Sequence, residues 1–284
     1  MSWENISVKK GFVKNTDSEL FTRKSVHSEM CIVGYIDILG SKQRILEDDS
    51  DSSLNSVYNL YTSTQTLFKK IKGVDCYKDV KTRIFSDNIV IFHPIESKAF
   101  KKLKLEDNIL NIYISLSIIN LLSAIFQIIA FSGLKWCVRG GISMGSIYNN
   151  GTLLWGKGLV QSYDIESEKA IYPRIVVDKI LIETLSLSDN KKMLEECLIT
   201  VDADGEYYVD FVAVLNLLAD RPDVGRKIHE LFEENFAELE SDNEKVLEKY
   251  RWFARTYANS MNKPEILENY PNLKFESENK NHGE

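Results

Sequence analysis

Two aspartates, Asp37 and Asp87, lie at the ends of hydrophobic runs that are typical of buried β-strands. Asp37 follows Cys-Ile-Val-Gly-Tyr-Ile, and Asp87 lies between Arg-Ile-Phe-Ser and Asn-Ile-Val-Ile-Phe. A carboxylate in apolar surroundings usually needs a cation, an arginine or a proton. Two of them predict a divalent metal site, because Mg²⁺ and Mn²⁺ prefer oxygen ligands and complete their coordination with water and phosphate.

Each aspartate also has a structural interpretation. Ser86, Asp87 and Asn88 between two apolar runs are good β-hairpin turn residues, and Asp37 before Ile-Leu-Gly could cap a helix. The residues alone leave both interpretations open.

Length and charge limit the classes of protein to which the chain can belong. Its 284 residues are enough for one large domain, or for one domain with an appendage. Its 35 basic and 42 acidic residues give a net charge of −7 and a pI of about 5.3, which argues against broad nucleic-acid binding. A nucleotide would therefore need a local pocket. No basic region followed by an apolar stretch opens the sequence, so we expect a cytoplasmic protein.

Four cysteines, Cys31, Cys76, Cys137 and Cys197, are scattered without the spacing of a metal site. The first three fall in expected strands. We interpret all four as reduced thiols in the core of a cytosolic protein.

The segment 108–134 contains no charged residue and is long enough to span a bilayer. Uncharged polar residues nevertheless recur along it at short intervals. They are Asn108, Asn111, Ser115, Asn120, Ser123 and Gln127. This spacing predicts a helix buried on most sides, with a polar stripe that faces solvent or pairs across a subunit interface, and not a membrane helix.

Periodicity and turn signals divide the chain into an N-terminal extension at 1–29, a core at 30–212, C-terminal helices at 213–263 and a polar tail at 264–284. The expected core elements are, in order, a strand ending at Asp37, a helix over 54–71, a hairpin of 76–85 and 89–93, the helix 108–134, a hairpin of 135–143 and 152–155, a helix over 157–171 and a strand over 173–178. This order predicts an α/β (α+β) fold. We expect a ferredoxin-like palm with a mixed or antiparallel sheet, helices packed on one face and a C-terminal helical extension.

The C-terminal region carries helix signals but no group of chemically active residues. Pro222 marks the start of one helix, and Ser241 with Glu244 predicts a capping box for the next. We expect these helices to pack against the core or a dimer partner. The polar region after Pro264 is expected to fray.

Four short motifs, in the same order along about residues 31–180, resemble the class III nucleotidyl cyclase catalytic domain. Residues 35–40, Tyr-Ile-Asp-Ile-Leu-Gly, are similar to its first strand and metal loop, and residues 83–87, Arg-Ile-Phe-Ser-Asp, to its second metal strand. Residues 138–145, Val-Arg-Gly-Gly-Ile-Ser-Met-Gly, are similar to its next core strand, and residues 155–167 to its dimer-interface helix.

The resemblance implies a metal-dependent site at these aspartates. Asp37 and Asp87 would hold two Mn²⁺ or Mg²⁺ ions, with the backbone carbonyl of Ile38 as a further ligand. Amides around Leu39 and Gly40 would receive phosphate oxygens of the nucleotide. In the family the site is shared by two chains, so the resemblance also implies a homodimer.

The chain departs from the resembled pattern at two catalytic positions. Val160 and Asp164 stand where typical members place a transition-state asparagine and arginine. Lys157, Arg139 and Arg174 are basic residues near the aligned site that could stabilise phosphate charge instead. Arg139 and Arg174 could equally pair with carboxylates and orient strands.

Base recognition departs as well. Arg83 and Leu153 stand where adenine-selective members pair a lysine with an aspartate, and guanine-selective members a glutamate with a small residue. Together with the strings Tyr-Ile-Asp-Ile-Leu-Gly and Tyr-Pro-Arg-Ile, this makes the chain similar to the pyrimidine cyclases of bacterial Pycsar antiphage systems. That resemblance implies synthesis of cyclic UMP or cyclic CMP, read by a separate effector protein. Because arginine only donates hydrogen bonds and uracil presents two carbonyls, Arg83 favours UTP.

Two other functions remain open at this stage. One is a purine nucleotide cyclase with an unusual base pocket. The other is a non-catalytic cyclase-like domain that binds a nucleotide or a protein partner, which the residues Val160 and Asp164 suggest.

Overall fold

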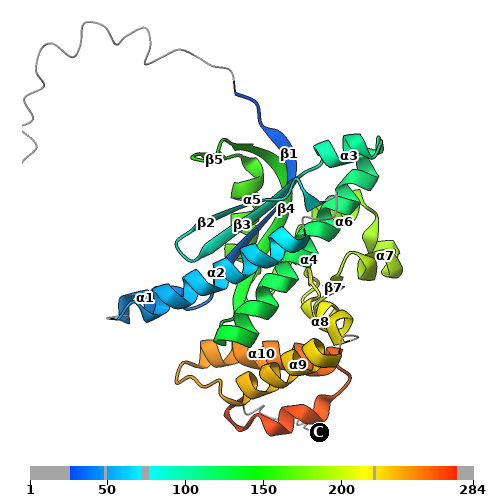
Figure 1. Ribbon diagram of the computed structural model, residues 1–284. Helices are drawn as coiled ribbons and strands as arrows, with labels where there is room; N and C mark the ends of the chain where they lie inside the picture. Colours follow the sequence, from blue (N-terminus) through cyan, green and yellow to red (C-terminus); the bar gives the residue numbers. More distant parts are fainter. Residues whose placement is uncertain (1–25, 48–49, 72–76, 220–221, 274–284) are drawn as a thin grey trace, which may run out of the picture.

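The computed structural model describes residues 26–47, 50–71, 77–219 and 222–273 (Figure 1). Cys76, most of the expected N-terminal extension and the end of the expected polar tail lie outside the described residues. Within these ranges, an 8-stranded sheet has the order β2-β3-β1-β4-β6-β8-β7, with β5 paired to β4. The strands are β1 (Glu29–Ile38), β2 (Lys81–Phe85), β3 (Asn88–Pro94), β4 (Val138–Asn149), β5 (Leu154–Trp155), β6 (Ile175–Val177), β7 (Ile199–Val201) and β8 (Tyr207–Val209).

Helices and short 3-10 turns connect and extend the strands. The helices are α1 (Ser41–Glu47), α2 (Ser52–Ile71), α3 (Lys98–Lys102), α4 (Asn108–Leu134), α5 (Lys157–Lys169), α6 (Lys179–Thr184), α7 (Lys191–Glu196), α8 (Phe211–Ala219), α9 (Pro222–Ala237) and α10 (Glu244–Ser260). The 3-10 turns are η3 (Leu187–Asp189), η4 (Pro264–Asn269) and η5 (Pro271–Leu273). Up to residue 178 the larger elements follow the predicted order, although β2 begins later than predicted and β4 runs on to Asn149.

The strands β1 to β4 and the helices between them form a ferredoxin-like unit. β1 pairs antiparallel with β3 on one side and with β4 on the other, and β2 pairs antiparallel with β3. A chain that runs β-α-β-β-α-β with this strand order is a split βαβ arrangement. β6 then adds to β4 in parallel, which makes the sheet mixed. The predicted fold class is confirmed.

Helices cover both faces of the sheet, so the expectation of helices on one face is wrong. Glycines in β1 and β4 explain the difference, because they allow a helix to approach from each side. A Cβ atom on Gly34 would lie 3.2 Å from Ile119 of α4, and one on Gly141 would lie 2.2 Å from the Ser162 carbonyl oxygen of α5. Gly34 and Gly141 point to opposite faces, so α4 packs on one face and α5 on the other.

The polar stripe of α4 is buried inside the chain, except for Asn108, which is exposed at the start of the helix. Asn120 donates to the Cys197 carbonyl at 2.7 Å, and Gln127 donates to the Pro173 carbonyl at 3.0 Å. Both polar side chains thus satisfy backbone groups of neighbouring segments, as buried polar groups must. The expectation that the stripe faces solvent or a second subunit is wrong, because the stripe pairs with other segments of the same chain.

α4 is also apolar enough to span a membrane by length and composition, with a mean hydropathy of 2.1. In the structure, 72% of its most apolar window is buried against the rest of the chain. Its long hydrophobic face packs on α2, β1 and β3, and these contacts are those of a core helix. This burial supports the interpretation of the segment as a core helix.

The C-terminal helices pack against the end of α4 and share its hydrophobic core. The ring of Phe131 lies 4.8 Å from Phe232, 4.7 Å from Phe236 and 4.9 Å from Phe253, measured between centroids. Figure 1 shows α9 and α10 at the end of the molecule where α4 finishes. The boundaries at residues 213 and 264 stay predictions, since one continuous core cluster crosses both of them.

Two local predictions in this region are wrong. The N-cap of α10 is Asn243, whose side chain accepts from Lys245 N, while Ser241 only accepts from Asn243 N at 3.1 Å. The amide side chain of Asn243, directly before the helix, replaces the predicted capping box. Over residues 264–273 the expected fraying is not found, because the chain continues as η4 and η5 and the apolar side chain of Leu273 returns to the core; residues 274–284 lie outside the described residues.

Three cysteines, Cys31, Cys137 and Cys197, are buried free thiols, as predicted. Burial raises the pKa of Cys31 to about 12 and that of Cys137 to about 12. They therefore stay protonated and pack as small apolar side chains.

Candidate active site

Asp37 lies near the end of β1, on the face of the sheet that α5 covers. Its neighbours Ile36 and Ile38 point into the core on the α4 side, so strand alternation turns Asp37 to the opposite face. Its cross-strand neighbours are Asn88 on β3 and Arg139 on β4. The hydrophobic strand therefore holds the carboxyl group at a fixed place on this face.

Asp87 lies in the tight turn between β2 and β3, next to Ser86 with a φ of +56°. Its carboxylate accepts hydrogen bonds from Ser41 Oγ and, at 3.2 Å, from Asn88 Nδ2. It also lies within hydrogen-bonding reach of the Asp37 carboxyl group. The turn interpretation is correct for Asp87, and this turn also brings the two aspartates together.

A third carboxylate, Glu166 on α5, joins this pair with its side chain only 3% exposed. Arg139 lies between the acids, with Nε 3.6 Å from Asp37 Oδ2 and 2.5 Å from Glu166 Oε1. The shorter contact is an ion pair without hydrogen-bond alignment. Among the described residues, Arg139 is the one cation within ion-pair distance of this carboxylate cluster, which we define as Asp37, Asp87 and Glu166.

Burial, neighbouring charges and hydrogen bonds shift the pKa values of the three acids in the carboxylate cluster. Burial, followed by the charges of Asp87 and Glu166, raises the pKa of Asp37 to about 7, and Arg139 offsets only part of that shift. Burial also raises the pKa of Glu166. For Asp87, burial is outweighed by hydrogen bonds from Ser41 and its neighbours, so its pKa is lowered. Asp37 and Asp87 are therefore a coupled pair in which Asp37 binds a proton more readily than Asp87 does.

The donor chemistry of Asp37 and Asp87 fits a divalent cation. Two adjacent carboxylates with one nearby guanidinium supply the oxygen ligands and the uncompensated negative charge that Mg²⁺ or Mn²⁺ requires. Within the described ranges no group of three or more His, Cys, Asp or Glu side chains has metal-binding geometry. Protein ligands at this place would therefore leave several coordination positions for phosphate and water.

One cavity adjoins the carboxylate cluster, and a second lies beside the turn after β1; residues of α1 line both. The first has a volume of about 320 Å³ and is lined by Ser41, Asp87 and Trp136 among others. The second, of about 590 Å³, lies between the turn after β1 and α10, and we call it the α10 cavity. Its lining includes Gly40 and Lys249. The predicted phosphate loop therefore borders an open space.

The predicted phosphate-loop residues form the turn between β1 and α1. The Leu39 amide donates to the Cys137 carbonyl at 2.9 Å, so this donor is engaged within the chain. Gly40 has a φ of +76°, a left-handed conformation that favours glycine at this turn. α1 begins directly after it, at Ser41, whose hydroxyl bonds Asp87.

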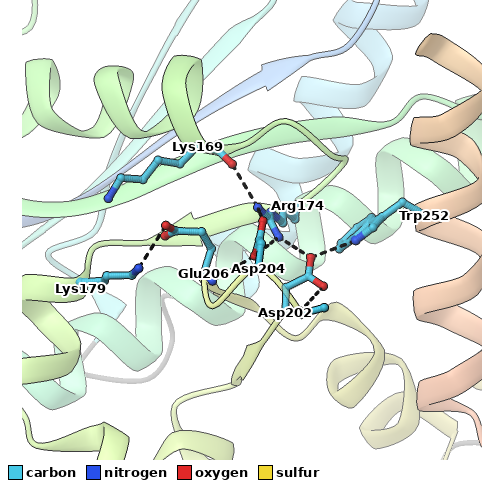
Figure 2. Close-up of polar contacts among 8 residues, drawn as sticks. Lys169, Arg174, Lys179, Asp202, Asp204, Glu206 and Trp252 are labelled. Carbon is cyan, nitrogen blue, oxygen red and sulfur yellow. Dashed lines mark hydrogen bonds and ion pairs between the residues drawn. The ribbon is translucent and has the colours of Figure 1, made fainter.

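Arg174 is bonded to acids other than those of the carboxylate cluster (Figure 2). Its side chain is 1% exposed, pairs with Asp202 and lies 2.5 Å from Asp204. It also donates to the Lys169 carbonyl at 3.2 Å. These contacts match the structural interpretation of Arg174 as an ion-pairing residue.

Lys157, Val160 and Asp164 are exposed side chains of α5. Lys157 is the first residue of α5 and Glu166 lies nine positions later, which at 1.5 Å per residue is roughly 13 Å along the axis. The structure does not bring Lys157 to the carboxylate cluster of the same chain.

Leu153 lies in the hairpin between β4 and β5, and the side chain of Arg83, a residue of β2, reaches this hairpin. Arg83 donates to Asn149 Oδ1 through Nε at 3.2 Å and through Nη2 at 2.8 Å. The Leu153 amide donates to Asn150 Oδ1 at 2.8 Å. The two predicted base-selecting residues therefore lie near the same hairpin. The Arg83 side chain points to Asn149 and does not bond Asp87, whose carboxylate is bonded to Ser41.

Three residues that the structure places around this site were not predicted from the sequence to belong to it: Glu166, Ser41 and Lys249. Glu166 carried a detectable signal, because Ser162, Ile165 and Glu166 share the buried side of α5 that packs on the glycines of β4. Lys249 had no such signal, since it lies on a surface helix far along the chain.

No family model matches this chain, and no curated protein matches it. Solved structures that match it include the adenylyl cyclase CyaB from P. aeruginosa, which is 12% identical and covers 65% of this chain and 95% of that chain with a TM-score of 0.42. A class III adenylyl cyclase-like ATP-binding protein from Pseudomonas aeruginosa is 14% identical, with 73% of this chain and 43% of that chain covered and a TM-score of 0.44. The guanylyl cyclase Cya2 is 11% identical, with coverages of 57% and 81% and a TM-score of 0.36. At these identities and TM-scores the matches assign neither a family nor an activity.

Proposed function

We propose that this protein is a nucleotidyl cyclase that converts UTP, or alternatively CTP, to its 3′,5′-cyclic monophosphate and pyrophosphate. The observation that carries the proposal is the pairing of Asp37 and Asp87 at the end of β1, beside the turn at Gly40. In the reaction, the ribose 3′ oxygen forms a bond to the α-phosphorus as the bond to the pyrophosphate oxygen breaks. The hydroxyl proton passes to solvent.

The residues of this chain would bind and orient the triphosphate. Asp37 and Asp87 would hold Mn²⁺ or Mg²⁺, which when bound neutralises phosphate charge and lowers the pKa of a coordinated hydroxyl. Ser41 orients the Asp87 carboxylate through its hydrogen bond, and Arg139 orients Asp37 and Glu166. The Ile38 carbonyl would add a further ligand. Arg139 is thus close enough to the site to stabilise phosphate charge as well.

The proposed base preference rests on Arg83 and Leu153. The Arg83 guanidinium donates to Asn149 Oδ1 and to the Thr82 carbonyl and keeps further N–H donors, beside the hairpin that carries the exposed Leu153. Donors together with an apolar side chain suit the carbonyl edge of uracil. An Arg83→Ala variant should lose about 1–3 kcal/mol of discrimination for UTP while keeping its metal affinity. Equal losses with all four nucleoside triphosphates, measured as kcat/KM, would instead indicate phosphate binding.

We further propose that the active form is a homodimer with a composite site. The α5 side of the sheet exposes several large apolar side chains: Phe85, Leu153, Trp155, Val160 and Tyr163. A second copy of this chain would cover them and could bring its own Lys157 to the carboxylate cluster. If so, mixed dimers of an Asp87→Ala chain and a Lys157→Ala chain should recover activity. No recovery in confirmed mixed dimers would contradict a shared site.

The proposed setting is a cytoplasmic defence system in which the cyclic nucleotide activates a separate effector. The strings Tyr-Ile-Asp-Ile-Leu-Gly and Tyr-Pro-Arg-Ile, similar to those of Pycsar cyclases, support this proposal. Pull-down assays that measure whether candidate effector proteins bind the cyclic nucleotide would test this setting without an activity assay of the cyclase.

The central experiment is a turnover assay with each of the four ribonucleoside triphosphates and Mn²⁺, with products identified by mass spectrometry. We expect cyclic UMP or cyclic CMP from the parent and none from Asp87→Ala. Glu234→Gln, which changes an exposed carboxylate on α9, serves as the matched control and should retain full activity. A purine product would support the purine alternative, and nucleotide binding without turnover the non-catalytic one. Activity at the parental level in Asp87→Ala would contradict the assignment of Asp37 and Asp87 as the active site.

A further inference from the structure

The α10 helix forms one wall of a cavity whose other wall is the turn after β1. Figure 1 shows α10 below the end of the sheet where β4 begins. The α10 cavity, about 590 Å³, is lined by Gly40 and Arg44 on one side and by Asn243, Lys249 and Tyr250 on the other. The C-terminal helices therefore border the candidate site, although the sequence indicated no chemical role for them.

Two cations face the α10 cavity. Arg44 lies over the Trp136 ring at 5.0 Å, and Lys249 lies near Arg139 and Cys137. Among the described residues, no carboxylate lies within ion-pair distance of Arg44 or Lys249. Burial, followed by the charge of Arg139, lowers the pKa of Lys249, so its charge is costly without an anion.

The acids of the α10 cavity do not compensate these cations. Glu47 and Asp242 are exposed at its rim, and Glu47 accepts a hydrogen bond from Gln43 Nε2 at 2.9 Å. One end of a phosphate chain in the α10 cavity would lie between two cations, Arg44 on one wall and Lys249 on the other, that have no carboxylate partner within the described ranges. Its other end would reach toward the turn at Gly40, three residues after Asp37.

A buried ion-pair group holds α10 in this position, and Figure 2 shows its contacts. Trp252 donates from Nε1 to Asp202 at 2.9 Å and stacks on Tyr172 with the ring centroids 5.3 Å apart and the planes 7° apart. Asp202 in turn pairs with Arg174. We call Arg174, Asp202 and Trp252 the α10 latch. Trp252 lies three residues after Lys249, which is nearly one helical turn, so the α10 latch fixes the direction of Lys249.

We propose that Lys249 binds the terminal phosphates of the nucleoside triphosphate, and the pyrophosphate product, and that the α10 latch positions it. This inference rests on the proposed function for the identity of the ligand. Lys249 contacts the ligand, whereas Trp252 and Arg174 are positioning residues.

The first test measures binding of inorganic pyrophosphate and tripolyphosphate with Mg²⁺ by titration calorimetry. Lys249→Ala should weaken both by about 10-fold or more, the usual effect of losing one charge-assisted hydrogen bond. Lys249→Arg should restore most of the affinity. The matched control is Lys245→Ala, one turn earlier on α10, whose side chain is exposed and does not line the α10 cavity, and this variant should bind as the parent does. Parental affinity in Lys249→Ala, or no probe binding to the parent, would overturn the inference.

The same variants separate this inference from the proposed function. If the parent produces no cyclic nucleotide but binds pyrophosphate through Lys249, the cyclase proposal fails and the anion site stands. If the parent is a cyclase and Lys249→Ala keeps its KM and probe affinity, only the present inference fails. Thermal melting shows whether each variant is folded.

A positioning role for the α10 latch needs a readout beyond stability. Trp252→Phe keeps an aromatic ring on Tyr172 but removes the hydrogen bond to Asp202. It should weaken pyrophosphate binding several-fold in the parent and have no further effect when combined with Lys249→Ala. Equal effects in both backgrounds would show that the latch acts on stability alone and would contradict positioning.

Discussion

The carboxylate cluster and the Arg174 ion-pair group differ in how their charges are balanced. Arg174 is 1% exposed and meets two aspartates, Asp202 and Asp204, while Nη2 also donates to the Lys169 carbonyl and Nε has no hydrogen-bond partner among the described residues. The carboxylate cluster collects three acids around one guanidinium, and that contact is poorly aligned. The charge of the first group is balanced within the chain, whereas the second keeps an excess of negative charge, which fits the added cation that we propose. A buried charge that the chain itself satisfies indicates structure, and one that it leaves unsatisfied indicates a ligand.

The largest effect is expected from breaking the Arg174 group. Arg174→Met should lower the free energy of unfolding by about 3 kcal/mol, because it removes charge-assisted hydrogen bonds from a buried guanidinium to the partly exposed Asp202 and the exposed Asp204. Urea denaturation followed by circular dichroism measures this. Lys179→Ala, which removes an exposed pair with Glu206, is the control and should cost less than about 1 kcal/mol. Similar losses in both variants would show that the Arg174 group has no special role in stability.

A divalent cation should stabilise the carboxylate cluster and leave the Arg174 group unchanged. At a free Mn²⁺ concentration of about 100 times Kd, binding to the folded state adds about 2.7 kcal/mol to the free energy of unfolding. The melting temperature of the parent should rise accordingly. Asp87→Ala should lose the Mn²⁺ response, while Asp204→Ala should keep it from a lower starting temperature. A Mn²⁺ response that survives Asp87→Ala would place the ion elsewhere.

The pH dependence of stability should have opposite signs in the two groups. The folded state binds the Asp37 proton more tightly than the unfolded chain does, since its pKa is raised from 3.8 to about 7. In metal-free buffer the free energy of unfolding should therefore fall as the pH rises from about 4 to 7, on the order of 2 kcal/mol, and Asp37→Asn should remove this fall.

For Asp204 the sign is reversed. A hydrogen bond from Arg174 lowers its pKa, so its contribution is present above its unfolded pKa and is lost as the pH falls through the lowered folded value. Unfolding curves of Asp204→Asn should therefore differ from the parent at neutral pH and converge with it in acid. Convergence at neutral pH would mean that Asp204 contributes nothing to the ion-pair group.

The features of the two charged groups that depend on local sequence pattern could be predicted. Asp37 and Asp87 could be placed because hydrophobic runs and turn residues locate strand ends along the chain. The same reasoning named Arg139 and Arg174 but could not tell them apart. Their partners, Glu166 for one and Asp202 for the other, are set by tertiary packing, which a single sequence does not display.

The other features that the sequence did not predict also depend on short elements or on tertiary packing. The elements between α6 and β8 are short, and several hold only a few residues, so their periodicity is too brief to detect. Gly34 and Gly141 were visible as residues, but the strand pairing that turns them to opposite faces was not. Lys249 lines the α10 cavity on a helix whose Trp252 bonds to Asp202, a residue distant in the sequence.

The aromatic contacts of Phe131 have a consequence for how the chain can be shortened. This ring ends α4 and meets three phenylalanines, Phe232, Phe236 and Phe253, while Asn235 donates to the Phe131 carbonyl at 2.6 Å. A fragment ending at residue 212 would lose these three rings and this hydrogen bond together. It would leave the last turn of the central helix as an exposed apolar end that promotes aggregation. The shortest fragment expected to fold on its own therefore includes α9 and α10, although neither belongs to the sheet.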